Sequence, residues 1–307
     1  YPGTVALGEI SSEDSLTTMS QYTQGNHRLH MGYSFDLLTD DYTAKYIKHV
    51  VQALEARVLD GWPCWSISNH DAKRVVSRWG GAQKYNTSPD FPKMLFAMIA
   101  SLRGSICSYQ GEELGLPEGD IAYKDIQDPY GIAFWPQFKG RDGCRTPHPW
   151  EQDELNAGFS NSKPWLPVVN CHKVLAVNKQ DSLDDSVLNS YRCFTKWRKQ
   201  YPELLYGEIE FIEVPEPILA FIRKYEEEEM LVCVNLSGQA QELFIPMAKH
   251  FIEQLGHKLP TATLTNETIS RLTLAKSLSK CCNIIVKSSA IADSDSSNFK
   301  NSSTASS

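Results

Sequence analysis

The sequence predicts an α/β protein in which half of an eightfold (β/α) barrel precedes a small antiparallel β domain. Two observations lead to this prediction. Up to about Leu205, short apolar runs alternate with longer segments of helical periodicity, which is the pattern of βα units in a parallel sheet. After Pro202, the runs are short, rich in β-forming residues and separated by turn residues, as in antiparallel hairpins.

The barrel half contains four predicted strands and three predicted helices. The strands are Thr4–Gly8, His30–Phe35, Pro63–Ser68 and Ser105–Tyr109. The helices are Ala44–Leu59, Pro92–Leu102 and Val187–Lys199. Apolar residues recur at helical spacing in the second helix, and Gly104 follows it as a stop signal. Four strands over residues 1–204 are half of what a closed eightfold barrel contains.

A long segment, residues 112–186, separates the last of these strands from its helix. Connections beyond about 15 residues without secondary structure of their own are uncommon, and they are usually functional. This one is rich in Trp, Pro, Gly and charged residues. We expect a binding loop whose tryptophans, Trp135, Trp150 and Trp165, pack within the loop rather than stack on a ligand.

The β domain is predicted over residues 205–289. Its strands are expected at Glu208–Val214, Ile218–Arg223, Met230–Asn235 and Glu242–Ile245. The run from Arg271 to the end lacks the strands that would close such a domain. Residues 290–307 are rich in Ser, Asp, Asn and Lys, and we expect a disordered tail there because they carry too little apolar surface to fold.

Bulk properties exclude several classes of protein. The net charge of −7 and the lack of a basic stripe argue against a nucleic-acid partner. No apolar run reaches the roughly 20 residues needed to cross a membrane. Eight cysteines are scattered without metal-ligand spacing, which predicts reduced thiols and a cytoplasmic protein without a metal or cofactor. Because the chain opens on Tyr1-Pro2-Gly3 without an initiator Met, we expect it to be a fragment.

Two of the predicted strands end in carboxylates. Glu9 follows the first strand, and the triplet Asn69-His70-Asp71 follows the third. Parallel barrels present catalytic groups at the C-terminal ends of their strands. Two carboxylates with an imidazole suit acid–base chemistry on a polar, uncharged substrate such as a sugar. Each group also has an ordinary interpretation, because Glu9 could be a surface turn residue and Asp71 a helix N-cap.

Four motifs and their order favour the catalytic interpretation. They are Gly8–Ile10, Asn69–Asp71, Tyr109–Gly115 and Gly140–Pro147 with Trp150. In identity and spacing, this set resembles the α-amylase superfamily of glycoside hydrolases, specifically its exo-acting α-glucosidase and oligo-1,6-glucosidase branch. The stretches Gln127–Gly131 and Ala157–Pro167 are similar to the same branch. The resemblance covers about Thr4 to Leu205, and it implies the C-terminal half of a (β/α)8 TIM barrel.

The resemblance implies a role for each candidate residue. Glu9 matches the general acid/base, and Asp71 matches the carboxylate that binds sugar hydroxyls in the oxocarbenium-like state. His70 matches a hydrogen-bonding partner of the same glucose. Arg141 resembles the arginine that closes the glucose pocket, with Arg145 as the less favoured candidate. The substrate would be a small α-glucoside, such as a maltose-like oligosaccharide, whose terminal glucose is hydrolysed with retention of configuration.

The nucleophile of this family is an Asp in a strand one barrel position before Glu9, and no such strand occurs in the sequence. We therefore expect the isolated chain to be inactive without the missing N-terminal half of its own barrel. Two alternatives stay open. One is a glucosyl-transferring or isomerising relative, such as a sucrose isomerase, trehalose synthase or amylosucrase. The other is a non-enzymatic relative that accompanies amino-acid transporters, which the retained Glu9, His70, Asp71 and Arg141 disfavour.

Overall fold

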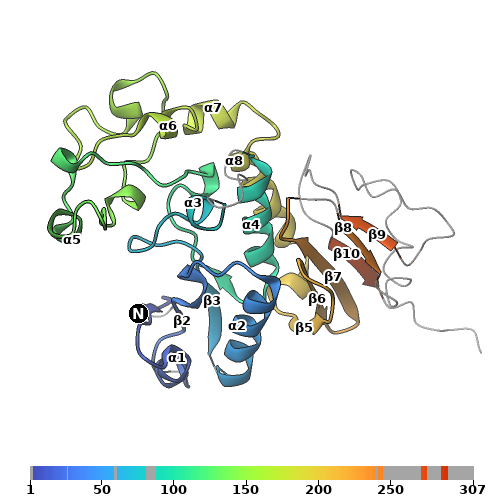
Figure 1. Cartoon of the computed structure of the whole chain (residues 1–307). Coiled ribbons are helices and arrows are strands. Elements are labelled where there is room, and N and C mark those ends of the chain that lie inside the picture. Colours follow the sequence, from blue (N-terminus) through green and yellow to red (C-terminus); the bar gives the residue numbers. More distant parts are fainter. Residues whose placement is uncertain are drawn as a thin grey trace, which may run out of the picture.

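A computed structural model describes residues 3–25, 27–58, 61–80, 88–238, 241–244, 271–274 and 285–289. Within these residues, the N-terminal part contains a parallel sheet with the strand order β1-β2-β3-β4. The strands are β1 (Leu7–Glu9), β2 (Met31–Tyr33), β3 (Trp62–Trp65) and β4 (Ser105–Ile106). Their order in space is their order in sequence, as in the wall of a barrel, and the predicted fold class is confirmed (Figure 1).

The strands are shorter than the sequence predicted, because the paired ladder stops where the chain turns toward the loops. In the third strand, pairing ends at Trp65, whose carbonyl still accepts a hydrogen bond from the Cys107 N–H at 2.8 Å. Ile67 and Ser68 continue as buried backbone outside the sheet, and their carbonyls accept side-chain hydrogen bonds from Arg78 at 2.6 Å and from Ser66 at 2.7 Å. The last residues of the predicted third strand therefore lie outside the sheet, in the short segment that leads to Asn69, His70 and Asp71.

Helices cover the sheet, and the three predicted ones are present as α2 (Ala44–Arg57), α4 (Asp90–Ser101) and α8 (Val187–Arg198). Two more, α1 (Ser15–Thr23) and α3 (Val75–Gly80), were not predicted. Helix α1 begins at Asp14, whose carboxylate accepts the Thr17 N–H at 3.1 Å. It buries only Met19 and Thr23, so its sequence carries too weak an apolar period to predict a helix.

The segment 112–186 projects from the sheet toward the upper left of Figure 1, and it is not the structureless loop that its length suggested. It contains short helices, α5 (Pro129–Ala133), α6 (Asn170–Lys173) and α7 (Val177–Asp181), and 3₁₀ turns at Glu112–Leu114, Tyr123–Asp125, Asp142–Cys144 and Leu155–Gly158. Within it, Leu114 and Leu116 form a small apolar cluster with Leu188 of α8. Turns this short lack the periodicity by which a helix can be predicted.

The C-terminal part is antiparallel. It begins after α9 (Pro202–Leu205) and contains a sheet with the order β10-β7-β6-β5 and a separate two-stranded sheet, β8 with β9. The bounds are β5 (Glu208–Ile212), β6 (Ile218–Tyr225), β7 (Glu228–Asn235), β8 (Gln241–Phe244), β9 (Arg271–Leu274) and β10 (Ile285–Ser289).

The expectation that the run from Arg271 lacks closing strands was wrong, because β9 pairs with β8 and β10 pairs with β7. Without β10, the edge of β7 would leave backbone N–H and C=O groups without partners. A strand can be held there by backbone hydrogen bonds alone, and these leave no apolar pattern in the sequence. The predicted disordered tail, 290–307, lies outside the described residues.

The barrel part and the antiparallel sheet share one apolar core, to which Leu95 of α4 and Phe221 of β6 both contribute. Arg223 of β6 is fully buried at the junction, where its guanidinium donates to the carbonyls of Ser101 at 2.6 Å and Gly207 at 2.8 Å. Glu216 reaches the start of α2 and accepts the Ala44 N–H at 3.2 Å. The β domain therefore packs against the helices α2 and α4 that cover the parallel sheet. None of the described helices is long and apolar enough to span a membrane.

Candidate active site

Glu9 and Asp71 come from different strands, and the structure links their segments through one amide. Glu9 is the last residue of β1, and Asn69 follows β3. The buried Asn69 donates from Nδ2 to Oε1 of Glu9 at 3.3 Å. Its Oδ1 accepts the backbone N–H groups of Asp71 at 2.9 Å and Ala72 at 2.8 Å. Both predicted carboxylates therefore lie at the same edge of the sheet.

Tyr33 is a neighbour of Glu9 that the sequence did not reveal. It ends β2, pairs in register with Glu9, and its phenol is hydrogen-bonded to the Glu9 carboxylate. Burial first, and the hydrogen bond to Glu9 second, raise the pKa of Tyr33 well above its usual value. The phenol therefore stays neutral and donates to Glu9. Its place at the end of the adjacent strand was the only signal for it in the sequence.

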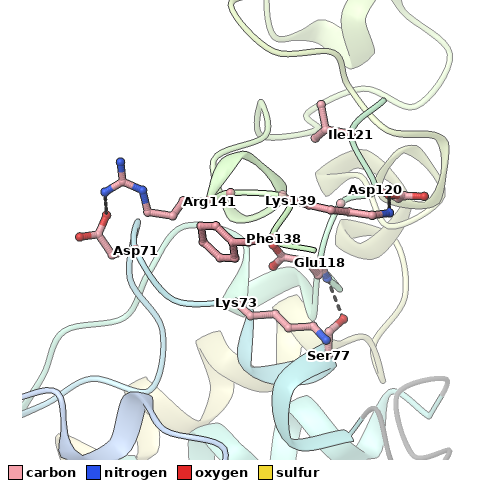
Figure 2. A pocket seen from close by; sticks show the side chains of 12 residues that line it. Asp71, Lys73, Ser77, Glu118, Asp120, Ile121, Phe138, Lys139 and Arg141 are labelled. Carbon is pink, nitrogen blue, oxygen red and sulfur yellow. Dashed lines mark hydrogen bonds and ion pairs between the residues drawn. The ribbon is translucent and has the colours of Figure 1, made fainter. Parts of the chain in front are cut away.

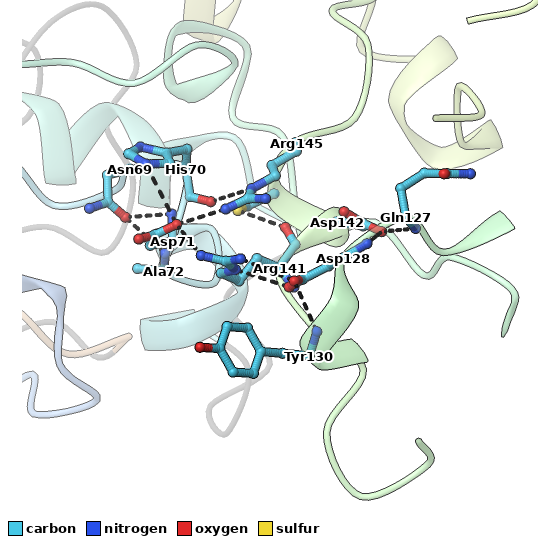
Figure 3. Close-up of polar contacts among 11 residues, drawn as sticks. Asn69, His70, Asp71, Ala72, Gln127, Asp128, Tyr130, Arg141, Asp142 and Arg145 are labelled. Carbon is cyan, nitrogen blue, oxygen red and sulfur yellow. Dashed lines mark hydrogen bonds and ion pairs between the residues drawn. The ribbon is translucent and has the colours of Figure 1, made fainter. Parts of the chain in front are cut away.

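Asp71 is the centre of a cluster of charged groups (Figure 3). Its Oδ1 accepts Nη1 of Arg141 at 3.0 Å and Nη2 of Arg145 at 2.7 Å. Arg145 also donates from Nε to the carbonyl of His70 at 2.7 Å. The imidazole Nε2 of His70 lies 3.6 Å from the same Oδ1. His70, Asp71 and Arg141 are thus brought together, and Arg145, ranked second from the sequence, contacts Asp71 as closely as Arg141 does.

Arg141 has a second carboxylate partner, Asp128, whose side chain is fully buried. Arg141 donates to it from Nε at 2.9 Å and from Nη2 at 3.0 Å, a bidentate contact. These hydrogen bonds are the main reason that the pKa of Asp128 falls to about 2. The ring of Tyr130 lies 5.4 Å from the guanidinium carbon of Arg141. Asp128 therefore fixes the side chain that extends to Asp71.

A buried arginine, Arg74, braces the loops that carry Asp71 and Arg145. Its guanidinium donates to the carbonyl of Gln110 at 2.7 Å and to Oγ1 of Thr146 at 3.3 Å. Thr146 in turn lies 3.2 Å from Nδ1 of His172, whose Nε2 lies 2.7 Å from the carbonyl of Pro117. Because the carbonyl can only accept, Nε2 carries the proton and Thr146 donates to Nδ1.

The His172 imidazole remains neutral in this network. Burial is the main reason that its pKa falls to about 4. Arg74, Thr146 and His172 are each at most 2% exposed. Arg74 follows Asp71 by three residues, and Thr146 follows Arg145 directly. Because this hydrogen-bond network is buried, it holds the loop of Asp71 and the loop of Arg145 in fixed positions relative to each other.

The segment Gln110–Glu113 lies against Arg74 and helps to hold its guanidinium in place. Gly111 has φ +90°, and a Cβ there would lie 2.5 Å from Nη1 of Arg74, so only glycine fits. Glu112 is buried and accepts a hydrogen bond from Ser108 Oγ at 2.8 Å, while its Oε1 has no partner among the described residues. Burial raises the pKa of Glu112 to about 7.

A pocket of about 510 Å³ opens beside the Asp71 cluster (Figure 2). Asp71 and Arg141 form one side of it, and Phe138, Lys73 and Glu118 line the rest with neighbouring loop residues. Within the described ranges, no three His, Cys, Asp or Glu side chains are placed to hold a metal ion. The six cysteines in those ranges are free thiols. The groups present can bind hydroxyls, exchange protons and stabilise charge.

Comparisons with known protein families and individual proteins give matches over most of the chain. Residues 1–207 match the family described as alpha amylase, catalytic domain, and residues 218–275 match the alpha-amylase SusG C-terminal domain. A probable alpha-glucosidase of Rhizobium meliloti is 41% identical over 270 residues, which are 87% of this chain and 48% of that protein. A probable oligo-1,6-glucosidase of Bacillus subtilis is 32% identical over 202 residues, which are 60% of this chain and 36% of that protein.

Among solved structures, the chain is similar to the alpha-glucosyl transfer enzyme XgtA. The TM-score is 0.81 and the sequence identity is 48%, over 94% of this chain and 51% of that one. The chain thus spans about half the length of the relatives it matches.

Proposed function

The chain belongs to the α-amylase family of glycoside hydrolases, and on that premise we propose that it is the C-terminal part of a retaining α-glucosidase. The enzyme would remove terminal α-linked glucose from short oligosaccharides. The observation that carries the proposal is the Asn69 bridge, which joins the Glu9 carboxylate to the loop of Asp71 at one edge of the sheet. A glycosidic bond needs an acid/base and a binding group on the same sugar, and this edge supplies both.

Glu9 is the proposed acid/base. Its carboxylate is exposed at the strand end, where a substrate can reach it, and it is oriented by the amide of Asn69 and the phenol of Tyr33. Both partners are neutral donors, so they orient the carboxylate without an ion pair. As an acid, Glu9 would protonate the glycosidic oxygen, and as a base it would then activate water.

Asp71 is proposed to bind sugar hydroxyls rather than to attack the anomeric carbon. Two guanidinium groups donate to its Oδ1, and such charge-assisted hydrogen bonds withdraw electron density from that oxygen. Its other oxygen and the His70 imidazole remain available to the same glucose. Retention requires a second catalytic carboxylate about 5 Å from the acid/base, and we propose that it comes from residues outside this sequence.

Glucosyl transfer is a second candidate reaction. It is favoured by the 48% identity to a protein described as an alpha-glucosyl transfer enzyme. Hydrolysis and transfer share the glycosyl intermediate and differ in whether water or a sugar hydroxyl attacks it. Product analysis separates the two, because maltose would give mainly glucose by hydrolysis and longer oligosaccharides by transfer.

The test is to assay the chain together with the N-terminal barrel half of the 41% identical Rhizobium meliloti relative, joined in one polypeptide. We expect hydrolysis of p-nitrophenyl α-glucoside and release of the α-anomer, observed by NMR. Glu9→Gln is the test variant, and Glu13→Gln, an exposed carboxylate in the loop after β1, is its matched control. A Glu9→Gln protein with nearly full activity would contradict the proposed role of Glu9.

A further inference from the structure

A second pocket, of about 480 Å³, lies in the segment 112–186 and shares no lining residue with the Asp71 cluster. Trp165 stands at this pocket with 76% of its surface exposed. The expectation that this tryptophan packs inside the loop was therefore wrong. Exposing an indole to this extent gives up a large apolar contribution, so a ligand that covers it would recover part of that contribution.

The other lining groups are polar and balanced in charge. They include the lysines Lys124, Lys163 and Lys173 and the carboxylates Asp125, Asp153 and Glu154. Among the described residues, the one ion pair in this set joins Asp153 to Lys179, which lies outside the pocket, at 3.7 Å. The charged groups of the pocket are thus not paired with one another. Their donors and acceptors remain available, with no net charge to select an anion or a cation.

The loop that precedes Trp165, residues 156–162, is held in a fixed conformation. Asn156 and Ala157 have φ values of 50° and 52°, in the left-handed region that residues other than glycine rarely adopt. Asn156 donates from Nδ2 to the carbonyls of Ser160 at 2.7 Å and Ser162 at 2.9 Å. Backbone strain of this kind persists where the surroundings enforce it, often at binding sites. The pocket therefore needs little ordering when a ligand binds.

We propose that this pocket is a second carbohydrate-binding site, in which the Trp165 indole covers one apolar face of a sugar in a neutral oligosaccharide. The hydroxyl groups at the edge of that ring would donate to Oδ1 of Asn156 and to the carboxylates of the pocket, and would accept from its lysines. A pocket of this size, with an aromatic wall and both donors and acceptors, fits a small uncharged polyol better than an anion or an apolar ligand. The inference does not depend on the catalytic roles of Glu9 and Asp71.

The test uses the 307-residue chain and two probes, maltotriose and isomaltotriose. Binding is measured by equilibrium dialysis with labelled probe, at protein concentrations low enough that sedimentation shows the chain to stay in solution. We expect saturable binding of at least one probe, weakened roughly tenfold or more in Trp165→Ala. Trp150→Ala is the matched control, because Trp150 is 50% exposed, contacts the His148 ring and lies outside the pocket. Trp165 is so exposed that its removal should leave the melting temperature nearly unchanged.

Three results would overturn the proposal. The first is no binding of either probe, and the second is equal binding by the Trp165→Ala chain. The third is binding that is lost in Asp71→Asn, which would place the sugar at the candidate active site instead. Self-association that disappears in Trp165→Ala without any sugar binding would identify the pocket as a protein contact and would also contradict the proposal. Failure of the catalytic assignment would leave the binding result unaffected.

Discussion

Asn69 donates a hydrogen bond to Glu9 at 3.3 Å although the two residues are 60 positions apart, Glu9 at the end of β1 and Asn69 in the segment that follows β3. The same amide group receives two backbone N–H groups from the turn that carries Asp71. One buried side chain thus sets the distance between the candidate acid/base and the candidate binding carboxylate. Geometry at this edge is therefore sensitive to small changes in either strand.

Replacing Glu9 by Gln in the assembled enzyme should remove most turnover and leave glucose binding nearly intact. Glutamine keeps the shape of the side chain but cannot give a proton to the leaving group, and loss of a general acid typically costs about 10²–10⁴-fold in rate. Steady-state kinetics with p-nitrophenyl α-glucoside and a glucose-binding titration measure the two effects. A loss below roughly tenfold would mean that another residue protonates the leaving group.

Replacing either of the two arginines that contact Asp71 by lysine should lower kcat/KM by about tenfold or more. Lysine cannot reproduce the forked contacts of a guanidinium group. Arg141→Lys would break the bidentate contact with Asp128, and Arg145→Lys would release His70 and Asp71. Asp128→Asn should therefore resemble Arg141→Lys. If Asp128→Asn has no effect, the buried carboxylate does not control the position of Arg141.

Thr146→Val removes the hydroxyl that links Arg74 to His172 and keeps the size of the side chain. We expect kcat/KM to fall about tenfold or more, since small displacements of catalytic groups can cost up to about 10²-fold. Thr146→Ser keeps the hydroxyl and should stay within about threefold of the parent. Equal losses in both variants would attribute the effect to the methyl group, which faces Gly119, and would contradict the proposed brace.

Glu112 should make the stability of the chain depend on pH near neutrality. Its pKa is raised by burial from an ordinary 4.5 to about 7, so the folded chain holds a proton that the unfolded chain has lost. The contribution of protonated Glu112 to the free energy of unfolding is fully present below pH 4.5. It is lost as the pH rises through 7, by up to about 3 kcal/mol.

Glu112→Gln cannot ionise and should raise the melting temperature at pH 8.5 more than at pH 5.5. Scanning fluorimetry at both values tests this, with the exposed Glu13→Gln as control. A difference between the variant and the parent that is independent of pH would show that Glu112 does not titrate in this range.

The isolated 307-residue chain should be poorly soluble and inactive on α-glucosides. The outer edge of β1 has no partner strand among the described residues, and Val5 and Leu7 are 66% and 44% exposed beside it. Open edges with apolar side chains favour aggregation. Sedimentation and activity assays of the purified chain are the measurements. Robust hydrolysis that is abolished by Asp71→Asn would instead make Asp71 the nucleophile.

Much of the architecture followed from local patterns in the sequence. Alternating apolar runs predicted the four parallel strands and the helices α2, α4 and α8, because each element has to bury one continuous face. Helix α1, the short turns in 112–186 and the strands after Arg271 were missed. Their sequences bury few residues or depend on the edge of another strand, so no local period marks them.

The sequence by itself determined which residues stand at the strand ends, namely Glu9, His70 and Asp71, since that placement depends only on where an apolar run stops. The tertiary structure decided which groups these residues meet. Arg145 on Asp71, Asp128 beneath Arg141 and Tyr33 against Glu9 are contacts between loops and strands far apart in the chain. Side-chain hydrogen bonds act over about 3 Å, and whether two distant loops approach that closely depends on how the whole chain packs, which no spacing within one segment records.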